Sequence, residues 1–170
     1  MVDPILARDL MVTNFETLRP DETLEAALRK LVALQGRVTE PGVVVVLDGE
    51  GRYHGLLTAH LFTLSLYAMW SPPDLEAPDP EDLHQSLLAS SGEFLSRRVD
   101  EMPKQEVAVV PPDARLLDVI VAGGATRPDF LPVVEAGQVL GLIPVPAVFQ
   151  AAASLTLTPE HEGIRFDQDD

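Results

Sequence analysis

An α/β (α+β) chain made of two copies of one β-α-β-β-α unit is predicted from three features of the sequence. The segment 43–58 has an apolar run, a turn with glycine and a second apolar run, which is typical of a β-hairpin. A second, weaker copy of that pattern occupies residues 130–144. A helical pattern precedes each hairpin, so the order of elements repeats along the chain.

The first copy begins with a short lead-in at residues 6–11 and an extended piece at 15–18. A helix is then predicted to start at Asp21 as N-cap and to end at Gly36. Its buried face is formed by apolar residues at helical spacing, namely Leu24, Ala27, Leu28, Leu31 and Leu34. After the hairpin, residues 59–70 predict a second helix that is apolar on most of its sides.

Proline and acidic residues then predict a stiff linker from residue 71, with a short helix that Ser90-Ser91-Gly92 breaks. The second copy repeats the lead-in at 100–102, a strand at 107–110 and a helix from Asp113 that Gly123-Gly124 ends. We therefore expect repeat 1 at 1–70, the linker at 71–95, repeat 2 at 96–153, and an acidic tail at 154–170 that is flexible or loosely docked.

The composition excludes several classes of partner and of functional site. The 170 residues carry a net charge of −15, which disfavours nucleic acid and anionic membranes as partners. No cysteine is present, the N-terminus lacks a signal-peptide pattern, and no apolar run reaches membrane-span length, so we expect a cytoplasmic protein. The four histidines show no metal-ligand spacing and no catalytic constellation appears, so we expect no metal and no enzyme activity.

The Asp-x-Met lead-ins, the Pro-Asp helix starts and the strands Gly55-Leu-Leu-Thr58 and Gly141-Leu-Ile together resemble the CBS (cystathionine β-synthase type) domain, here in tandem as a Bateman module. The resemblance covers residues 6–70 and 96–153. It implies two CBS-type repeats packed with pseudo-twofold symmetry, with clefts at their boundary. Such clefts commonly hold AMP, ADP, ATP or S-adenosylmethionine as regulatory ligands, and no cofactor is required. The resemblance also implies a homodimer.

The sequence departs from the family where the ligand would bind. The family pattern at the end of the third strand is Gly-h-h-Thr/Ser-x-x-Asp, in which the hydroxyl contacts phosphate and the carboxylate holds the ribose. Thr58 is present in repeat 1, but Leu61 stands at the Asp position. In repeat 2, Pro144 and Ala147 replace both polar residues, whereas Pro132 matches the family.

The expected ligand-binding residues are Thr58, His60, Val43, Thr13, Lys104, Arg127 and Pro132. Thr58 could bind a phosphate or simply cap the following helix. His60 could replace the missing ribose contact or be a surface histidine. Lys104 and Arg127 could neutralise phosphate or be solvated charges.

Two functions from different classes remain open. One is a non-catalytic, dimeric regulatory module that senses an adenosine-type nucleotide in the cleft between the repeats. The other is a degenerate pair that binds no nucleotide and serves as a dimerisation or docking module for an unidentified enzyme or transporter. Dimerisation is expected on the apolar helix at 59–70 through Leu61, Phe62, Tyr67, Met69 and Trp70, unless the linker helix covers that face.

Overall fold

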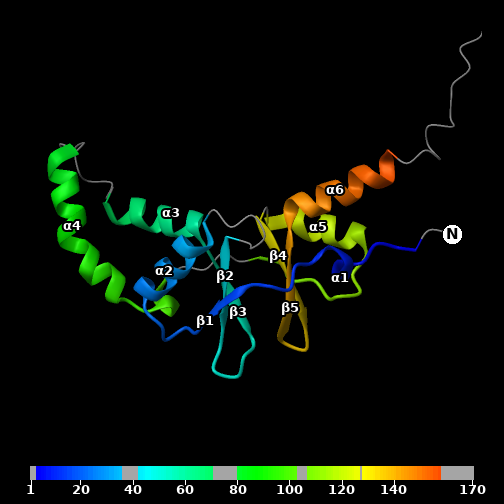
Figure 1. Ribbon diagram of the computed structural model, residues 1–170, viewed down its shortest axis with the longest axis horizontal. Coiled ribbons are helices and arrows are strands. Elements are labelled where there is room, and N and C mark those ends of the chain that lie inside the picture. Colours follow the sequence, from blue (N-terminus) through cyan, green and yellow to red (C-terminus); the bar gives the residue numbers. More distant parts are fainter. Residues whose placement is uncertain (1–2, 36–41, 71–79, 103–106, 127, 158–170) are drawn as a thin grey trace, which may run out of the picture. The chain divides into compact units, whose positions relative to one another are not determined.

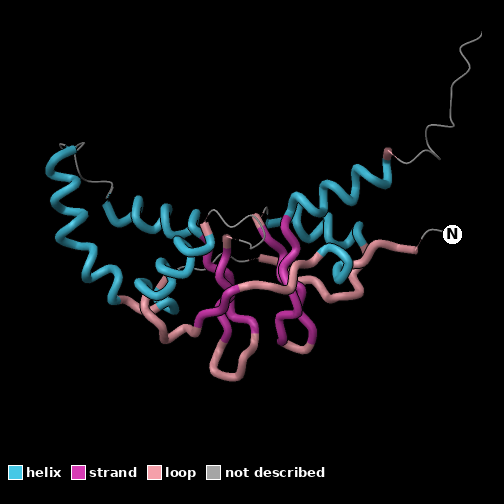
Figure 2. The backbone as a smooth tube through the Cα atoms, in the orientation of Figure 1, coloured by secondary structure: helices cyan, strands magenta, loops and turns pink. Residues whose placement is uncertain are grey.

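The computed structural model describes residues 3–35, 42–70, 80–102, 107–126 and 128–157. The chain forms two compact units (Figures 1 and 2). One unit is continuous, from Asn14 to Glu106, and the other combines Met1–Thr13 with Val107–Asp170. We refer to them as the continuous and the discontinuous unit. Their mixture of helices and small sheets confirms the predicted α+β class.

The continuous unit contains the whole predicted element order of the first copy. Its strands are β1 (Glu16–Leu18), β2 (Val43–Leu47) and β3 (Tyr53–Thr58), in the order β1-β2-β3. β1 runs parallel to β2, and β2 is antiparallel to β3. Its helices are α2 (Leu24–Leu34), α3 (Ala59–Trp70), α4 (Pro80–Ser96) and the 3-10 turn η1 (Val99–Glu101).

The β2–β3 hairpin forms because its strand is buried and its turn is held by one side chain. Residues 43–46 are four valines without solvent exposure, and β-branched side chains suit such a strand. At the turn, Asp48 Oδ1 accepts the N–H groups of Glu50 at 2.8 Å and Arg52 at 2.9 Å. Gly51 takes the positive φ of 77° that the turn requires. The hairpin therefore fixes where β3 ends, at Thr58.

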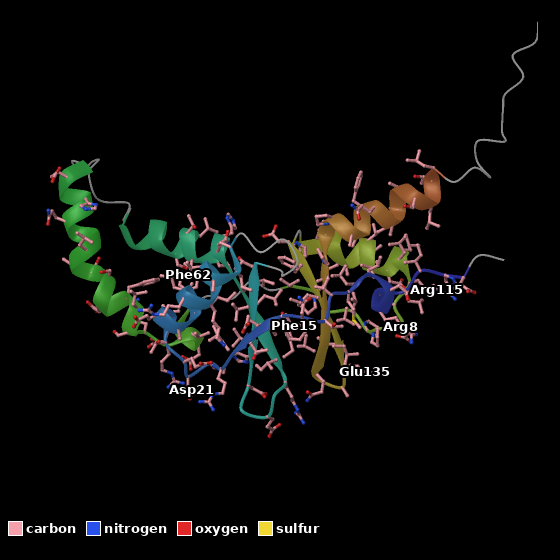
Figure 3. The ribbon with its side chains drawn as sticks, viewed as in Figure 1. Arg8, Phe15, Asp21, Phe62, Arg115 and Glu135 are labelled. Carbon is pink, nitrogen blue, oxygen red and sulfur yellow. The ribbon has the colours of Figure 1, made fainter. Side chains whose placement is uncertain are left out.

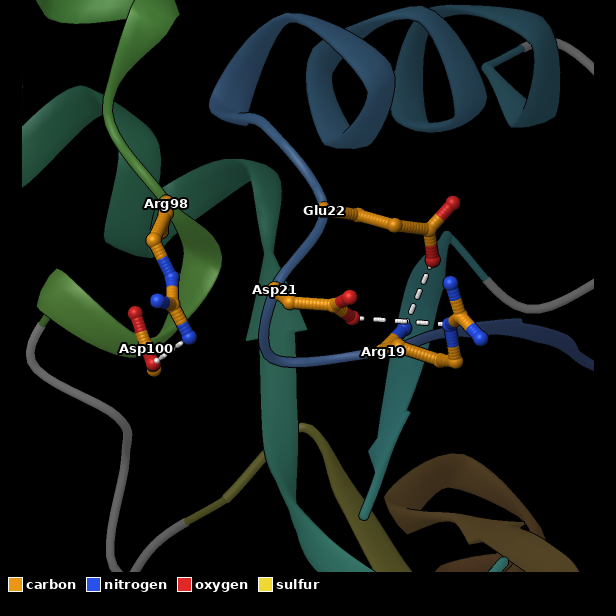
Figure 4. A network of polar contacts seen from close by, with 5 residues as sticks. All are labelled: Arg19, Asp21, Glu22, Arg98 and Asp100. Atoms are coloured by element: carbon orange, nitrogen blue, oxygen red, sulfur yellow. Dashed lines mark hydrogen bonds and ion pairs between the residues drawn. The ribbon is translucent and has the colours of Figure 1, made fainter. Parts of the chain in front are cut away.

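Thr23, and not the predicted Asp21, is the N-cap of α2. Thr23 Oγ1 accepts the N–H of Ala26 at 3.3 Å. Asp21 instead forms an ion pair with Arg19 at 3.4 Å, and the Arg19 N–H donates to Glu22 Oε2 at 2.6 Å (Figure 4). The loop before α2 therefore uses the side chains of Asp21 and Glu22, and the helix starts two residues later than predicted.

The prediction that Ser90-Ser91-Gly92 breaks the linker helix is wrong. α4 continues through these residues to Ser96. The Ser91 hydroxyl donates to the Leu88 carbonyl within the helix at 2.9 Å. Beyond the glycine, Phe94 is buried in the core of the continuous unit, with Leu95 packed against that core. Tertiary burial of these residues outweighs the helix cost of one glycine, about 1 kcal/mol.

The discontinuous unit contains the second copy. It consists of α1 (Ala7–Leu10), α5 (Leu116–Thr126), β4 (Phe130–Glu135), β5 (Gln138–Pro144) and α6 (Val145–Thr156). The predicted strand at 107–110 is reduced to one bridge, in which the Val110 N–H donates to the Pro132 carbonyl at 3.0 Å. The prolines that follow Val110 have no N–H with which to extend a ladder. The predicted end of α5 at Gly123-Gly124 is also wrong, since the helix continues to Thr126.

Each lead-in packs with the other repeat, so the compact units do not follow the contiguous repeats predicted from the sequence. In the discontinuous unit, the Ala7 N–H donates to the Ala114 carbonyl at 2.8 Å. The continuous unit has the equivalent hydrogen bond, from the Val99 N–H to the Glu22 carbonyl at 2.8 Å. Val99 is 92 residues after Ala7, and Glu22 is 92 residues before Ala114. The starts of α5 and α2 are matched in the same way, since their first N–H groups donate to the carbonyls of Ile5 and Arg97. The N-terminal lead-in also pairs with β5, because Val12 and Leu142 exchange hydrogen bonds of 2.8 and 2.9 Å.

Gly141→Ala is expected to destabilise the protein by about 1–3 kcal/mol, the range for overpacked sites. A Cβ at residue 141 would lie 2.7 Å from the Val12 carbonyl oxygen and 2.8 Å from the Met11 sulfur. The Val12 backbone cannot retreat without breaking its bonds to Leu142. Urea unfolding measures the change.

Gly92→Ala is the matched control for this substitution. No atom lies within 4 Å of a Cβ at residue 92, in the interior of α4. It should stabilise the protein by roughly 0.5–1 kcal/mol, the usual gain of alanine over glycine in a helix. Equal effects of the two substitutions would contradict the close contact at Gly141.

Candidate functional site

Thr58 stands where the hairpin ends and α3 begins. It is the last residue of β3, and its side chain is 5% exposed. Its Oγ1 accepts the N–H of Leu61 at 3.2 Å, which is the hydrogen bond of a helix N-cap. Thr58 therefore caps α3, which is one of the two roles that the sequence left open for it. Capping uses the hydroxyl as an acceptor, and a hydroxyl also carries one proton that it can donate.

Val43 lies directly beside Thr58. The two residues are partners in the β2–β3 register, and Val43 has no exposed surface. His60 follows in the first turn of α3 and is exposed. Three of the predicted ligand-binding residues thus lie at one end of the β2–β3 pair, where an apolar strand end, a hydroxyl and a helix N-terminus adjoin. Such a place can hold an anionic group, because the N-terminal N–H groups of a helix favour negative charge.

Thr13 and Pro132 belong to the discontinuous unit. Thr13 is exposed and follows the segment that pairs with β5. Pro132 is buried in β4, and its carbonyl accepts the Val110 N–H at 3.0 Å. Lys104 and Arg127 lie outside the described residues. Within one unit, the structure therefore brings together Thr58, Val43 and His60.

Two side chains of the hairpin have clearly shifted pKa values, and both lie at its opposite end from Thr58. Burial raises the pKa of Tyr53, at the start of β3, to about 12. The N–H of Arg52 lowers the pKa of Asp48 at the turn. Both shifts accompany features of the hairpin itself, namely a half-buried phenol and a turn held by a carboxylate.

The residues of α3 that were expected at a dimer interface differ in how far they are buried. Phe62 is 3% exposed and packs edge-on against Phe94 of α4, with ring centroids 6.4 Å apart (Figure 3). Its ring therefore belongs to the core of its own unit, and the linker helix covers that side of α3. Leu61 is half-buried. The side chains of Tyr67, Met69 and Trp70 lie outside the description.

A second feature was not foreseen from the sequence. An apolar groove of about 540 Å³ lies between α5 and α6, and its lining includes Ile120, Gly123, Gly124, Val145, Val148 and Phe149. The sequence feature that could have indicated this groove is the scarcity of charged residues in the two helices. α6 has no charged residue and α5 has one, Asp118.

Among the described residues, no group of three or more His, Asp and Glu side chains could hold a metal ion. In the same part of the chain, none of the helices has the length and apolarity needed to span a membrane.

Comparison with known proteins gives one family match, over part of the chain, and several similar folds. Residues 7–60 match the CBS domain family, whereas no curated protein matches the chain. A CBS domain-containing protein of unknown function from Kribbella flavida DSM 17836 has a similar structure, with a TM-score of 0.65 and 19% identity over 88% of this chain and 99% of that one. CBSX2 in complex with AMP has a TM-score of 0.60 and 20% identity over 89% and 98% of the two chains. The cytosolic domain of the Mg²⁺ channel MgtE in complex with ATP has a TM-score of 0.57 and 23% identity over 84% of this chain and 47% of that one.

Thr58→Val is expected to lower the free energy of unfolding by about 1 kcal/mol, because it removes the cap of α3 while nearly preserving side-chain volume. Thr58→Ser keeps the hydroxyl and should restore most of the loss. Chemical unfolding of the three proteins measures both effects. A serine variant as unstable as the valine variant would show that the hydrogen bond to Leu61 is not what matters at this position.

Proposed function

The chain contains a CBS domain and has the fold of CBS-domain proteins, and from this premise we propose that it is a non-catalytic regulatory module that binds an adenosine-type nucleotide and works as a homodimer. The ligand class comprises AMP, ADP, ATP and S-adenosylmethionine. The observation that carries the proposal is the junction of β3 and α3, where Thr58, Val43 and His60 meet.

The phosphate part of the ligand is assigned to this junction. Thr58 caps a helix of 12 residues, whose first turn offers backbone N–H groups to an anion. The Thr58 hydroxyl can donate to a phosphate oxygen while it still accepts from Leu61. His60, exposed two residues after the cap, can donate or accept at the ribose. Two structures of similar fold carry AMP and ATP in their complexes, which supports this ligand class.

The missing carboxylates limit how tightly such a ligand would bind. Leu61 is half-buried where the family pattern has an aspartate, so no carboxylate at that position can hold the ribose hydroxyls. In the second repeat, the corresponding positions are Pro144, at the end of β5, and Ala147 in α6. Binding would therefore depend on backbone groups and Thr58, in the first repeat alone.

The same departures favour the second candidate function. A pair that has lost three of its four polar ligand positions retains a fold without its usual recognition chemistry. On that hypothesis the protein serves as a dimerisation or docking module, and its partner is an enzyme or transporter that the sequence does not identify.

A thermal-unfolding series with AMP, ADP, ATP and S-adenosylmethionine separates these functions. A ligand that binds only the native state adds about 2.7 kcal/mol at 100 times its Kd, which raises Tm by several degrees. We expect one ligand to give such a shift in the wild type and in Thr58→Ser, and a much smaller one in Thr58→Val.

Thr23→Val is the matched control for loss of a cap. Thr23 caps α2 as Thr58 caps α3, through one hydrogen bond to a backbone N–H. Its variant should lose stability but keep the full ligand-induced shift. If none of the four compounds at millimolar concentration shifts Tm of the wild type, the nucleotide proposal fails and the docking module takes its place.

A further inference from the structure

The groove between α5 and α6 is open because small residues face it. The two helices contact each other in the discontinuous unit (Figure 1). A Cβ added at Gly124 would have no atom within 4 Å, and one at Gly123 would meet only the Leu131 side chain, at 3.5 Å. The lining comes from α5, α6 and residues 128–131, and all of its residues are apolar. The groove therefore suits an apolar side chain.

The first repeat shows which segment covers an equivalent helix pair. α2 and α5 both have 11 residues and α3 and α6 both have 12, so Gly123 corresponds to the buried Leu31 and Val148 to the buried Phe62. The cover is α4, the next element after α3. α4 packs against α2, and its Phe94 ring meets the Phe62 ring edge-on. In the first repeat, the chain that follows the helix pair thus folds back onto it and supplies an aromatic side chain.

In the second repeat, the chain that follows the helix pair is the stretch 158–170, which lies outside the described residues. We call this stretch the tail segment. Its large apolar residues are Ile164 and Phe166, two positions apart, so both would face the same side of an extended chain. Pro159 and Gly163, which are residue types common in turns, precede them. The tail segment therefore has the residues needed to reverse its direction and to fill an apolar groove.

The tail segment is also long enough to reach the groove. Phe166 follows Thr156, the last residue of α6, by 10 residues, which span up to about 33 Å when extended. Val148 lies eight residues before Thr156, or about 12 Å along the helix. The remaining length allows the chain to turn. A short tether also gives a segment an effective concentration in roughly the millimolar range, which favours it over a separate molecule of similar chemistry.

The distribution of charge favours this acidic segment at α5 and α6. Five of its 13 residues are Asp or Glu, and a chain of net charge −15 repels it over most of its surface. The two helices carry one charged side chain, Asp118. Arg8 and Arg115 are exposed beside the start of α5, where the Arg8 N–H donates to the Pro112 carbonyl at 3.0 Å and Arg115 forms a bridge with Leu6 (Figure 3). Neither arginine forms an ion pair with a described residue, so both can offset the charge of the tail segment.

We propose that the tail segment folds back onto the groove between α5 and α6 of its own chain, with the side chains of Ile164 and Phe166 in the groove. Phe166 is then the counterpart of Phe94, and it contacts Val148 as Phe94 contacts Phe62. Any other occupant of the groove has to displace the tail segment, which makes this segment a competitor built into the chain. The proposal rests neither on nucleotide binding nor on the homodimer.

Disulfide trapping tests this contact, because the chain has no cysteine of its own. Gly124→Cys places one thiol at the groove, where a side chain has room, and cysteine has a better helix propensity than glycine. Ile164→Cys places the second thiol, and Arg165→Cys is the matched control. Equilibration in glutathione buffers gives the effective concentration of each thiol pair. We expect a value at least about tenfold higher with Ile164→Cys, whereas a tail that is tethered but not docked gives equal values, since the two loops differ by one residue.

Three further substitutions in the Gly124→Cys/Ile164→Cys protein locate the contact. Phe166→Ser should lower the effective concentration to that of the Arg165→Cys pair, because it removes the aromatic group. Phe149→Ser should also lower it, and Leu117→Ser, the matched control, should leave it unchanged. Phe149 and Leu117 are 72% and 70% exposed, and of the two it is Phe149 that lines the groove. Because both side chains are exposed, neither substitution should unfold the protein, which circular dichroism checks.

Three results would overturn the proposal. They are equal effective concentrations for the Ile164→Cys and Arg165→Cys pairs, a Phe166→Ser protein that traps as well as its parent, and disulfides that join two chains instead of closing one. The last result would mean that the groove takes its occupant from another copy. If the two thiol pairs behave alike while a nucleotide still raises Tm of the wild type, this inference fails and the nucleotide proposal stands. Selective trapping without any nucleotide-induced shift would show the reverse.

Discussion

The exchange of lead-in segments is the constraint on which the rest of the structure depends. Each helix that precedes a hairpin, α2 or α5, starts on a carbonyl just before the lead-in of the other repeat, that of Arg97 or Ile5. The first N–H groups of a helix have no hydrogen-bond partner within the helix, and each of these bonds supplies a partner for one of them. Neither repeat, taken as a contiguous stretch, contains all the backbone partners of its own fold. Stability is therefore shared, and a defect in the lead-in at Val12 acts on β5, more than a hundred residues later.

The two repeats keep one backbone plan but differ in the side chains at the end of the hairpin and between the two helices. The first retains a hydroxyl at Thr58 and fills its helix pair with Leu31, Phe62 and the ring of Phe94. The second has Pro144 at the position of Thr58 and Gly123 at the position of Leu31. Substitutions that remove polar ligand groups and substitutions that open an apolar groove thus occur in the same repeat.

Periodicity in the sequence predicted the β-hairpins, the helix pairs and the α+β class, because buried strands and helix faces leave regular apolar patterns. It failed where tertiary contacts outweigh local preference. Gly92 and Gly123 do not end their helices, since buried residues nearby hold the backbone helical. Thr58, Val43 and His60 could be grouped because they adjoin one hairpin. The lead-in exchange joins residues about 100 positions apart, and no local pattern reports it. The groove was missed because glycines in a helix were interpreted as a stop signal and not as open space.

The net charge of −15 gives a physical reason why the two repeats carry different polar groups. A strongly acidic chain must place an anionic ligand where local dipoles, and not the overall field, favour it. A capped helix N-terminus such as that of α3 provides a local field of this kind. The second repeat keeps no such group, because Pro144, the N-cap of α6, makes no side-chain cap hydrogen bond. Its helices α5 and α6 together carry one charged side chain, Asp118. Duplication therefore lets one helix pair keep a polar cap at Thr58 while the other is almost free of charge.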